Sequence, residues 1–202
     1  MNNNMNREEY LNKLTGELNK RLFKQHGYSL PLDTIKVSCG FPCRKALSNK
    51  NRTIGQCFPT ESNGYNEIFI HPQLEDITEI GGVLVHELVH AYDDCKNGHK
   101  KPFKDIAIKV GLTGKMTATE PTEELKDLLK DIETGLGKYP HKSLEPSTKN
   151  KQTTRMLKLV CPTSHPEQKK DQYILRASNT TIELSGFPVC PCGLQMQQEE
   201  TE

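Results

Sequence analysis

The sequence predicts an α+β fold in which helices pack on a small antiparallel sheet, and three observations support this. Residues 7–26 and 76–98 place apolar side chains at helical spacing. Short segments rich in β-branched residues lie between those two stretches. Residues 155–194 carry cysteines near both ends and are too few to bury a large core of their own. We therefore expect a main α+β domain followed by a small β module.

The elements follow the chain in order. A helix over residues 7–26 precedes strands at 33–38, 54–58 and 67–71, and helices follow at 76–98, 101–110 and 123–133. Asn63-Gly64 is a strong hairpin signal between the last two of those strands. In the C-terminal module we expect strands at 172–177 and 180–184. The sheet is predicted to be antiparallel, with an edge strand beside the long central helix.

A change of composition divides the chain. Beyond the helix at 123–133, basic residues and prolines accumulate and acidic residues become rare. The predicted parts are a domain at 1–137, a basic linker at 138–154, a β module at 155–194 and a disordered polar tail at 195–202.

Composition limits the classes of protein. The 202 residues are 34% hydrophobic, the mean hydropathy is −0.69, and no apolar run approaches the ~20 residues that cross a bilayer. With no hydrophobic leader at the start, we expect a cytoplasmic or nucleoid-associated protein that is not secreted and has no membrane contact. Its cysteines should then be reduced. Cys39, Cys43 and Cys57 are interpreted as small buried residues, with a structural metal or a redox pair as the alternative, and Cys95 as a packing residue.

The most specific motif is His-Glu-x-x-His in the helix at 76–98. Residues four apart share one face of a helix, so His86 and His90 can converge on one cation. Glu87 lies about 100° further round the helix, beside that cation. A carboxylate there can take a proton from water on a zinc ion, which brings the pKa of that water to about 7. The spacing therefore suits hydrolysis at a zinc site.

Such a zinc ion needs a third protein ligand, and two residues compete for the role. Gly98 can end the helix in the left-handed conformation and turn His99 back toward the metal. Asp94 lies one more turn along the face of the two histidines, where it would more naturally orient a histidine. The sequence favours His99.

The alternative is a buried helix whose histidines have ordinary partners. Against it, the motif has helix signals around it: a capping box at Asp76 and Glu79, and a stop at Gly98. The apolar residues of this segment also follow helical spacing.

Residues 84–103, with H-E-L-V-H-A followed by G-H-x-x-x-F, resemble the SprT-like zinc metallopeptidases, a family that includes the Spartan proteases, which digest proteins crosslinked to DNA. Further similarity lies at residues 37–42, 54–57, 111–119 and 151–155. The resemblance implies a minimal zincin-like domain in which His86, His90 and His99 bind a catalytic zinc and Glu87 is the general base. It also makes Met116 a candidate for a methionine turn beneath the metal, with a plain core methionine as the alternative.

The C-terminal module resembles the zinc ribbon that closes many SprT-like proteins. The family pattern expects a cysteine where this chain has Ser164. If His165 substitutes for it, the ligands of a second, structural zinc are Cys161, His165, Cys190 and Cys192. If it does not, the ribbon is degenerate and holds no metal.

These features predict a zinc endopeptidase that acts on DNA-associated proteins. Clustered basic residues suit a phosphate backbone even though the formal net charge is only +1. The candidate nucleic-acid contacts are Lys142, Lys149, Lys151, Arg155 and Lys158. A solvated tether is the competing interpretation of this cluster. Two alternatives stay open for the whole chain: a non-catalytic, zinc-stabilised DNA-binding or adaptor module, and a processing protease without DNA.

Overall fold

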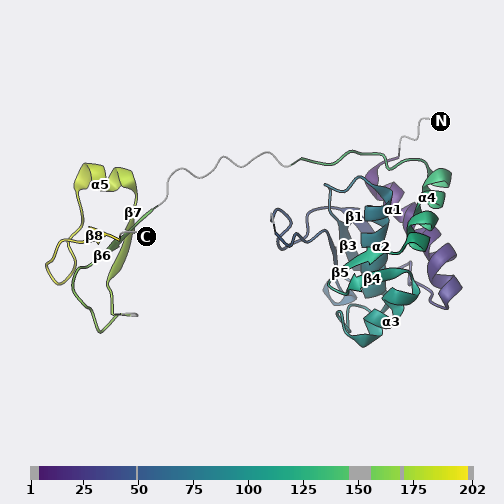
Figure 1. Ribbon diagram of the computed structural model, residues 1–202, viewed down its shortest axis with the longest axis horizontal. Coiled ribbons are helices and arrows are strands. Elements are labelled where there is room, and N and C mark those ends of the chain that lie inside the picture. The colour runs from purple at the N-terminus through teal and green to yellow at the C-terminus, as the bar shows by residue number, and fades with distance from the viewer. Residues whose placement is uncertain (1–4, 49, 146–155, 169–170, 200–202) are drawn as a thin grey trace. The chain divides into compact units, whose positions relative to one another are not determined.

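The computed structural model describes residues 5–48, 50–145, 156–168 and 171–199, and the chain is α+β, as predicted (Figure 1). The chain divides into two compact units, residues 1–145 and 146–202. Each unit is described by itself below.

The first unit begins with α1 (Arg7–Leu18), whose start is fixed by a capping box. The Asn6 side chain accepts from the backbone N–H of Glu9 at 2.8 Å, and the Glu9 carboxylate accepts from the backbone N–H of Asn6 at 2.9 Å. The helix continues through η1 (Asn19–Phe23) and η2 (Lys24–His26) and ends at Gly27, whose φ of 83° is left-handed. This agrees with the predicted helix over residues 7–26.

A three-stranded sheet follows, made of β1 (Ile35–Cys39), β2 (Gly55–Cys57) and β3 (Asn66–Ile70) in the order β1-β3-β2. The hairpin from β2 to β3 was predicted and is antiparallel, but β1 is parallel to β3, so the prediction of an antiparallel sheet was wrong. β2 follows β1 in the sequence but does not pair with it, because the long connection over residues 40–54 carries the chain one strand position further. β3 then pairs with both strands from the position between them. Loop length alone does not reveal such a skip.

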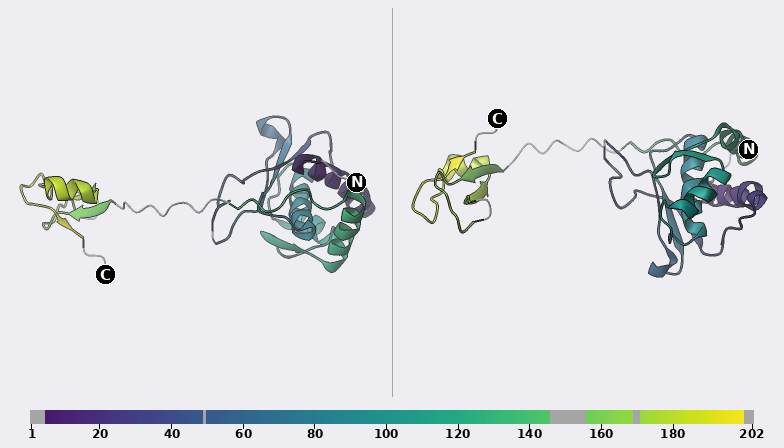
Figure 2. Two further views of the ribbon diagram at one scale, coloured as in Figure 1. Left: turned by 90° about the horizontal axis from the view of Figure 1, so that it is seen from above. Right: turned by 60° about the horizontal axis from the view of Figure 1, so that its bottom comes forward.

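The helix α2 (Ile77–Tyr92) lies in the middle of this unit (Figure 1). It packs against α1, β2 and β3, and against three later elements: α3 (Lys101–Lys109), β5 (Ala118–Pro121) and α4 (Glu123–Leu136). Asp76 caps it by accepting from the backbone N–H of Thr78 at 2.8 Å and of Glu79 at 3.2 Å. Gly81 permits the close packing with α4, because a Cβ there would lie 2.2 Å from Cδ2 of Leu129. Two further orientations show the same surroundings of α2 (Figure 2).

After α2 come α3 (Lys101–Lys109), with a proline in its first turn, and α4 (Glu123–Leu136), with Thr122 as its cap. Between them lies an antiparallel hairpin of β4 (Leu112–Lys115) and β5 (Ala118–Pro121) that was not predicted. Its residues lack alternating apolar character, so periodicity gives no strand signal there.

One hydrophobic core holds these elements together, and its largest fully buried side chains include Tyr10, Phe23, Phe103, Leu84 and Leu88.

Residues 138–145, predicted to begin the linker, lie against the first unit. The Tyr139 ring meets the edge of Tyr10 at a centroid distance of 5.3 Å. The guanidinium of Arg7 donates to the Lys142 carbonyl at 2.7 Å, and the backbone N–H of Leu144 donates to the Pro72 carbonyl at 2.9 Å. The predicted linker residues that follow Glu145 lie outside the described residues.

The second unit contains an antiparallel sheet of β6 (Leu157–Val160), β7 (Ile174–Ala177) and β8 (Gln197–Gln198), in the order β7-β6-β8. Its small core consists of Leu159, Cys161, Ala177, Cys190 and Met196.

Two predictions for this unit were wrong. Residues 180–184 were expected to form a strand but belong to the helix α5 (Asn179–Ser185). The Ser178 hydroxyl caps that helix by accepting from the backbone N–H of Thr181 at 3.1 Å. This cap stabilises the helix against the preference of the following β-branched residues for a strand. The start of the tail was expected to be disordered, but Gln197 pairs with Val160 of β6 and Met196 is buried.

Within the described part of the chain, no helix combines the length and the apolar character needed to span a membrane.

Candidate metal centres

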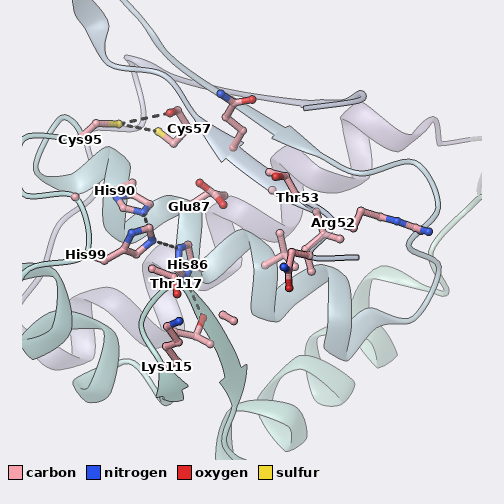
Figure 3. Close-up of a pocket in the computed structure, with 18 residues that line it drawn as sticks. Arg52, Thr53, Cys57, His86, Glu87, His90, Cys95, His99, Lys115 and Thr117 are labelled. Atoms are coloured by element: carbon pink, nitrogen blue, oxygen red, sulfur yellow. Dashed lines mark hydrogen bonds between the residues drawn. The ribbon is translucent and has the colours of Figure 1, made fainter. Parts of the chain in front are cut away.

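His86 and His90 stand one helical turn apart on α2, with ring centroids 5.1 Å apart. The third histidine of the predicted set reaches them through the turn after the helix. Asp94, Cys95 and Gly98 have positive φ values of 56°, 59° and 49°, so the chain bends back within a few residues. Nε2 of His99 then lies 3.1 Å from Nε2 of His86 and 3.2 Å from Nε2 of His90 (Figure 3).

This geometry fits a zinc ion. Three Zn–N bonds of about 2.05 Å at tetrahedral angles place the nitrogens about 3.3 Å apart, close to both observed separations. A hydrogen bond from His99 Nε2 uses one proton and can join it to only one of the other two nitrogens. Three lone pairs that point at one cation would bring all three nitrogens together. Nδ1 of His86 lies 2.9 Å from the Thr119 hydroxyl on β5. That contact can hold the proton on Nδ1 and leave the Nε2 lone pair free.

The imidazoles are also kept neutral. Burial, reinforced by the two neighbouring histidines, lowers the pKa of His86 to about 3. Burial and then His99 lower the pKa of His90 to about 4, and burial lowers that of His99. Neutral rings have lone pairs available for a metal at neutral pH.

Phe103 on α3 packs against all three rings. It stacks on His90 at a centroid distance of 4.4 Å and lies 4.9 Å from His86 and 5.1 Å from His99. Sequence reasoning gave this residue no role, although it ends the G-H-x-x-x-F stretch. Its spacing from His99 across the start of a helix was the available signal.

Glu87 lines the same cleft and is only 6% exposed. Burial, with a smaller effect of Cys95, raises the pKa of Glu87 to about 8, and a hydrogen bond from the backbone N–H of Cys57 opposes that rise. Gly55 lets β2 pass directly over this carboxylate, because a Cβ there would lie 2.6 Å from Glu87 Oε1. Neither Gly55 nor Cys57 was assigned to the site from the sequence.

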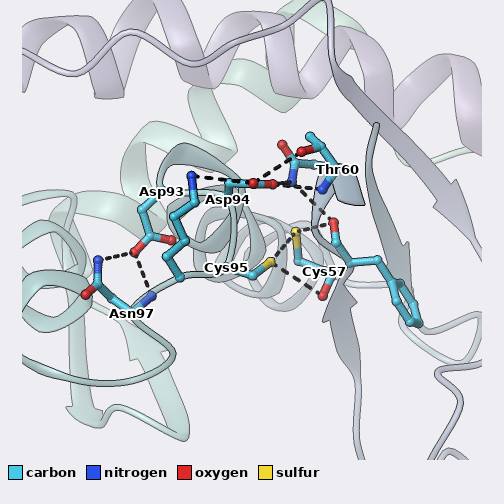
Figure 4. A network of polar contacts seen from close by, with 9 residues as sticks. Cys57, Thr60, Asp93, Asp94, Cys95 and Asn97 are labelled. Carbon is cyan, nitrogen blue, oxygen red and sulfur yellow. Dashed lines mark hydrogen bonds and ion pairs between the residues drawn. The ribbon is translucent and has the colours of Figure 1, made fainter. Parts of the chain in front are cut away.

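Asp94, the competing third ligand, faces a different group of residues. Its carboxylate accepts from the backbone N–H of Thr60 at 2.8 Å, from the Thr60 hydroxyl at 3.2 Å and from the Asn66 side chain at 3.0 Å (Figure 4). It therefore fastens the turn after α2 to the β2–β3 hairpin. The structure brings His99, and not Asp94, to the other two histidines.

The cleft runs between two walls. One consists of residues 51–54 and β2, and the other consists of Lys115 and Thr117–Thr119 in the β4–β5 hairpin. Met116, the candidate residue for the floor of the metal site, is half-buried against the hydrophobic core.

The second candidate centre lies in the second unit. Sγ of Cys161 is 3.5 Å from Sγ of Cys192, and Sγ of Cys190 is 3.3 Å from Nε2 of His165. The four ligand atoms lie within 4.8 Å of one another, as a tetrahedral site with three thiolates and one imidazole requires. Glu167 contacts Nδ1 of His165 at 2.9 Å and can orient the ring. The group includes His165, which directly follows Ser164, the position at which the family pattern has cysteine.

The candidate nucleic-acid contacts are only partly described. Lys142 is exposed, whereas the ammonium of Lys158 forms an ion pair with Glu199. Lys149, Lys151 and Arg155 lie outside the described residues.

Comparisons of the chain with protein families, curated proteins and solved structures found no match.

Proposed function

We propose that the first unit is a zinc-dependent endopeptidase of the SprT-like, zincin-like type. The observation that carries this proposal is the convergence of three Nε2 atoms, from His86, His90 and His99, in a cleft that also holds the Glu87 carboxylate. A three-histidine set leaves one position of a tetrahedral ion open, as catalytic sites require. A purely structural site would close that position with a fourth side chain.

When bound, zinc supplies Lewis-acid chemistry, lowering the pKa of water and polarising a carbonyl group. The donor set suits it, because neutral imidazoles are good zinc ligands and the rings are braced by Phe103 and Thr119.

Glu87 acts as the general base. Its carboxylate takes a proton from the attacking water as the new C–O bond forms at the scissile carbonyl. The same carboxyl group then delivers that proton to the leaving nitrogen as the C–N bond breaks. In its ionised form Glu87 is a stronger proton acceptor than an exposed glutamate, because burial raises its pKa. The N–H of Cys57 holds the carboxylate in place.

The proposed substrate is an extended polypeptide. β2 is at one edge of its sheet, so its outer side can pair with a strand that enters the cleft. The β4–β5 hairpin forms the opposite wall, and Thr119 links that wall to His86.

For the second unit we propose a structural zinc held by Cys161, His165, Cys190 and Cys192. The few buried apolar residues of this unit form a small core, and a bound metal would supply the stability that this core lacks. We further propose that the basic residues of positions 138–158 bring the enzyme to DNA-bound proteins. The many lysines and few acidic residues in this segment support binding to a phosphate backbone. Lys158 contributes less to such binding, because its ammonium group already forms an ion pair with Glu199.

The decisive experiment compares Glu87→Gln with Glu17→Gln, a glutamate on α1 outside the cleft. Both proteins should hold two zinc ions per chain by elemental analysis. Cleavage of an unfolded protein should fall at least ~100-fold for Glu87→Gln and stay at the native rate for Glu17→Gln. Native cleavage by Glu87→Gln would overturn the mechanism. Bound zinc with no cleavage by the native chain would favour the adaptor alternative.

DNA dependence is measured separately. Cleavage of a DNA-binding protein should rise when single-stranded DNA is added at low salt, and the gain should shrink as salt rises. A rate independent of DNA and salt would favour the processing protease.

A further inference from the structure

Two thiols meet in the wall of the cleft. Cys57 ends β2 and Cys95 lies in the turn after α2, yet their Sγ atoms are 3.5 Å apart across a sequence separation of 38 residues (Figure 4). The Cys95 thiol also lies 3.7 Å from the Cys57 carbonyl. The sequence suggested that Cys57 is a small buried residue, with a structural metal or a redox pair as the alternative, and that Cys95 is a packing residue; it did not pair the two.

The surrounding structure holds the two thiols together. Asp94, the neighbour of Cys95, is bonded to Thr60 and Asn66 of the β2–β3 hairpin. The backbone N–H of Cys95 donates to the His90 carbonyl at 2.8 Å, and Cys57 is registered against Ile68 of β3. Both cysteines are thus anchored at the backbone, and little rearrangement separates them from bonding distance.

A metal site does not explain the pair. Among the described residues, the groups of three or more potential metal ligands are the two already discussed, and neither includes Cys57 or Cys95. Both residues are half-buried and line the cleft, so a small oxidant can reach them.

We propose that Cys57 and Cys95 are a redox modification site that closes to a disulfide under peroxide. The two thiols together lose two protons and two electrons, and one S–S bond forms. The peroxide accepts them, its O–O bond breaks, and two water molecules result. A disulfide needs a sulfur separation of about 2.05 Å, so the two atoms must approach by roughly 1.5 Å.

The expected consequence rests on the proposed function. The backbone N–H of Cys57 bonds the Glu87 carboxylate, and Gly55 lies directly over it. Drawing β2 toward the turn after α2 therefore displaces the groups that hold Glu87. We expect oxidation to lower cleavage about tenfold and a dithiol to restore it.

The chain offers a direct test. Residues 53–96 contain no lysine or arginine before Lys96, and Cys57 and Cys95 are the two cysteines among them. Zinc-loaded full-length protein is treated with peroxide, blocked with an alkylating agent and digested with trypsin. We expect the 53–96 peptide to be unalkylated and about 2 Da lighter than its reduced form. Digestion after glutamate should leave the two cysteine fragments joined until a dithiol separates them.

Cys95→Ser and Cys57→Ser should each abolish the mass change, whereas Cys43→Ser, which removes an exposed thiol elsewhere, should not. Complete alkylation of Cys57 and Cys95 under conditions that oxidise Cys43 would overturn the proposal. The mass readout does not depend on activity, so a native chain that forms the disulfide but never cleaves protein refutes the proposed function alone. An active enzyme that forms the disulfide without losing rate refutes the regulatory consequence.

Discussion

Nε2 of His99 lies 3.1 Å from Nε2 of His86 although the residues are separated by the end of α2 and a turn with three positive φ values. Two of those values belong to Asp94 and Cys95, and the left-handed conformation is uncommon for residues other than glycine. The hydrogen bonds of Asp94 to Thr60 and Asn66 offset that cost. The third candidate ligand therefore depends on the β2–β3 hairpin as well as on α2.

His99→Ala should remove the zinc proposed for the first unit, because two imidazoles alone bind a zinc ion weakly. Elemental analysis should show the zinc content fall from two ions per chain to one. His26→Ala, which removes an exposed histidine at the end of η2, should keep both ions. Full zinc content in His99→Ala would show that this ring is not a ligand.

Gly55→Ala should slow cleavage by at least ~10-fold while both zinc ions stay bound. The added methyl group would lie 2.6 Å from Oε1 of Glu87 and 2.5 Å from Cγ1 of Val83, so the carboxylate must shift. Gly135→Ala is the control, since nothing lies within 4 Å of its Cβ position. Kinetics on an unfolded substrate measure the effect, and equal rates for the two variants would contradict it.

Gly81→Ala should lower the free energy of unfolding by about 1–3 kcal/mol. Its Cβ would lie 2.2 Å from Cδ2 and 2.7 Å from Cδ1 of Leu129, so α2 and α4 must separate or the leucine must change rotamer. Gly16→Ala on α1 meets nothing within 4 Å and should gain up to about 1 kcal/mol from helix propensity. Urea unfolding of the two variants tests the opposite signs.

Alkaline pH should destabilise the first unit through Tyr10. Burial and then Glu133 raise the pKa of Tyr10 to about 12, and its hydroxyl donates to the Gly137 carbonyl at 3.0 Å. The folded-state pKa is above the unfolded value of about 10, so this contribution is complete below pH 10 and is lost as pH rises through 12.

Between pH 9 and pH 11 the native protein should therefore lose about 1 kcal/mol more stability than Tyr10→Phe. Denaturant midpoints at the two pH values give that difference. Parallel losses in the two proteins would show that Tyr10 does not titrate with folding.

Cys192→Ser should remove the zinc proposed for the second unit and loosen that unit. Its Sγ lies 3.5 Å from that of Cys161, and the few buried apolar residues around them cannot replace a lost metal bond. Limited proteolysis should cut the second unit faster than in Cys43→Ser. Native zinc content and native resistance in Cys192→Ser would exclude this cysteine from a metal site.

The sequence predicted much of the arrangement of the candidate site because its signals are local. His86, Glu87 and His90 lie on one helix with a recognisable cap at Asp76, and Gly98 marks the turn to His99. Contacts between distant segments escaped prediction. Three contacts depend on how the elements pack against one another: the stacking of Phe103 on His90, the bond of Thr119 with His86, and the meeting of Cys57 with Cys95.

The fold was predicted to a similar depth. The helices and the β2–β3 hairpin carry periodicity or turn signals, whereas the parallel pairing of β1 with β3 follows from how the chain crosses the sheet. The prediction of a strand at residues 180–184 was wrong because the hydroxyl of Ser178 caps a helix there. Patterns of neighbouring residues do not show whether a local hydrogen bond or the packing of distant segments contributes more to stability.

The hydrogen bonds of Asp94 to Thr60 and Asn66 attach the turn that carries His99 to the β2 side of the cleft. The β4–β5 hairpin on the opposite side contacts the three histidines through Thr119, which bonds His86. On the proposed function, substitutions at Lys115 and Thr117 on the hairpin side can therefore change which polypeptides fit while the three histidines keep their positions. A designer who wished to retarget this scaffold would randomise that side first.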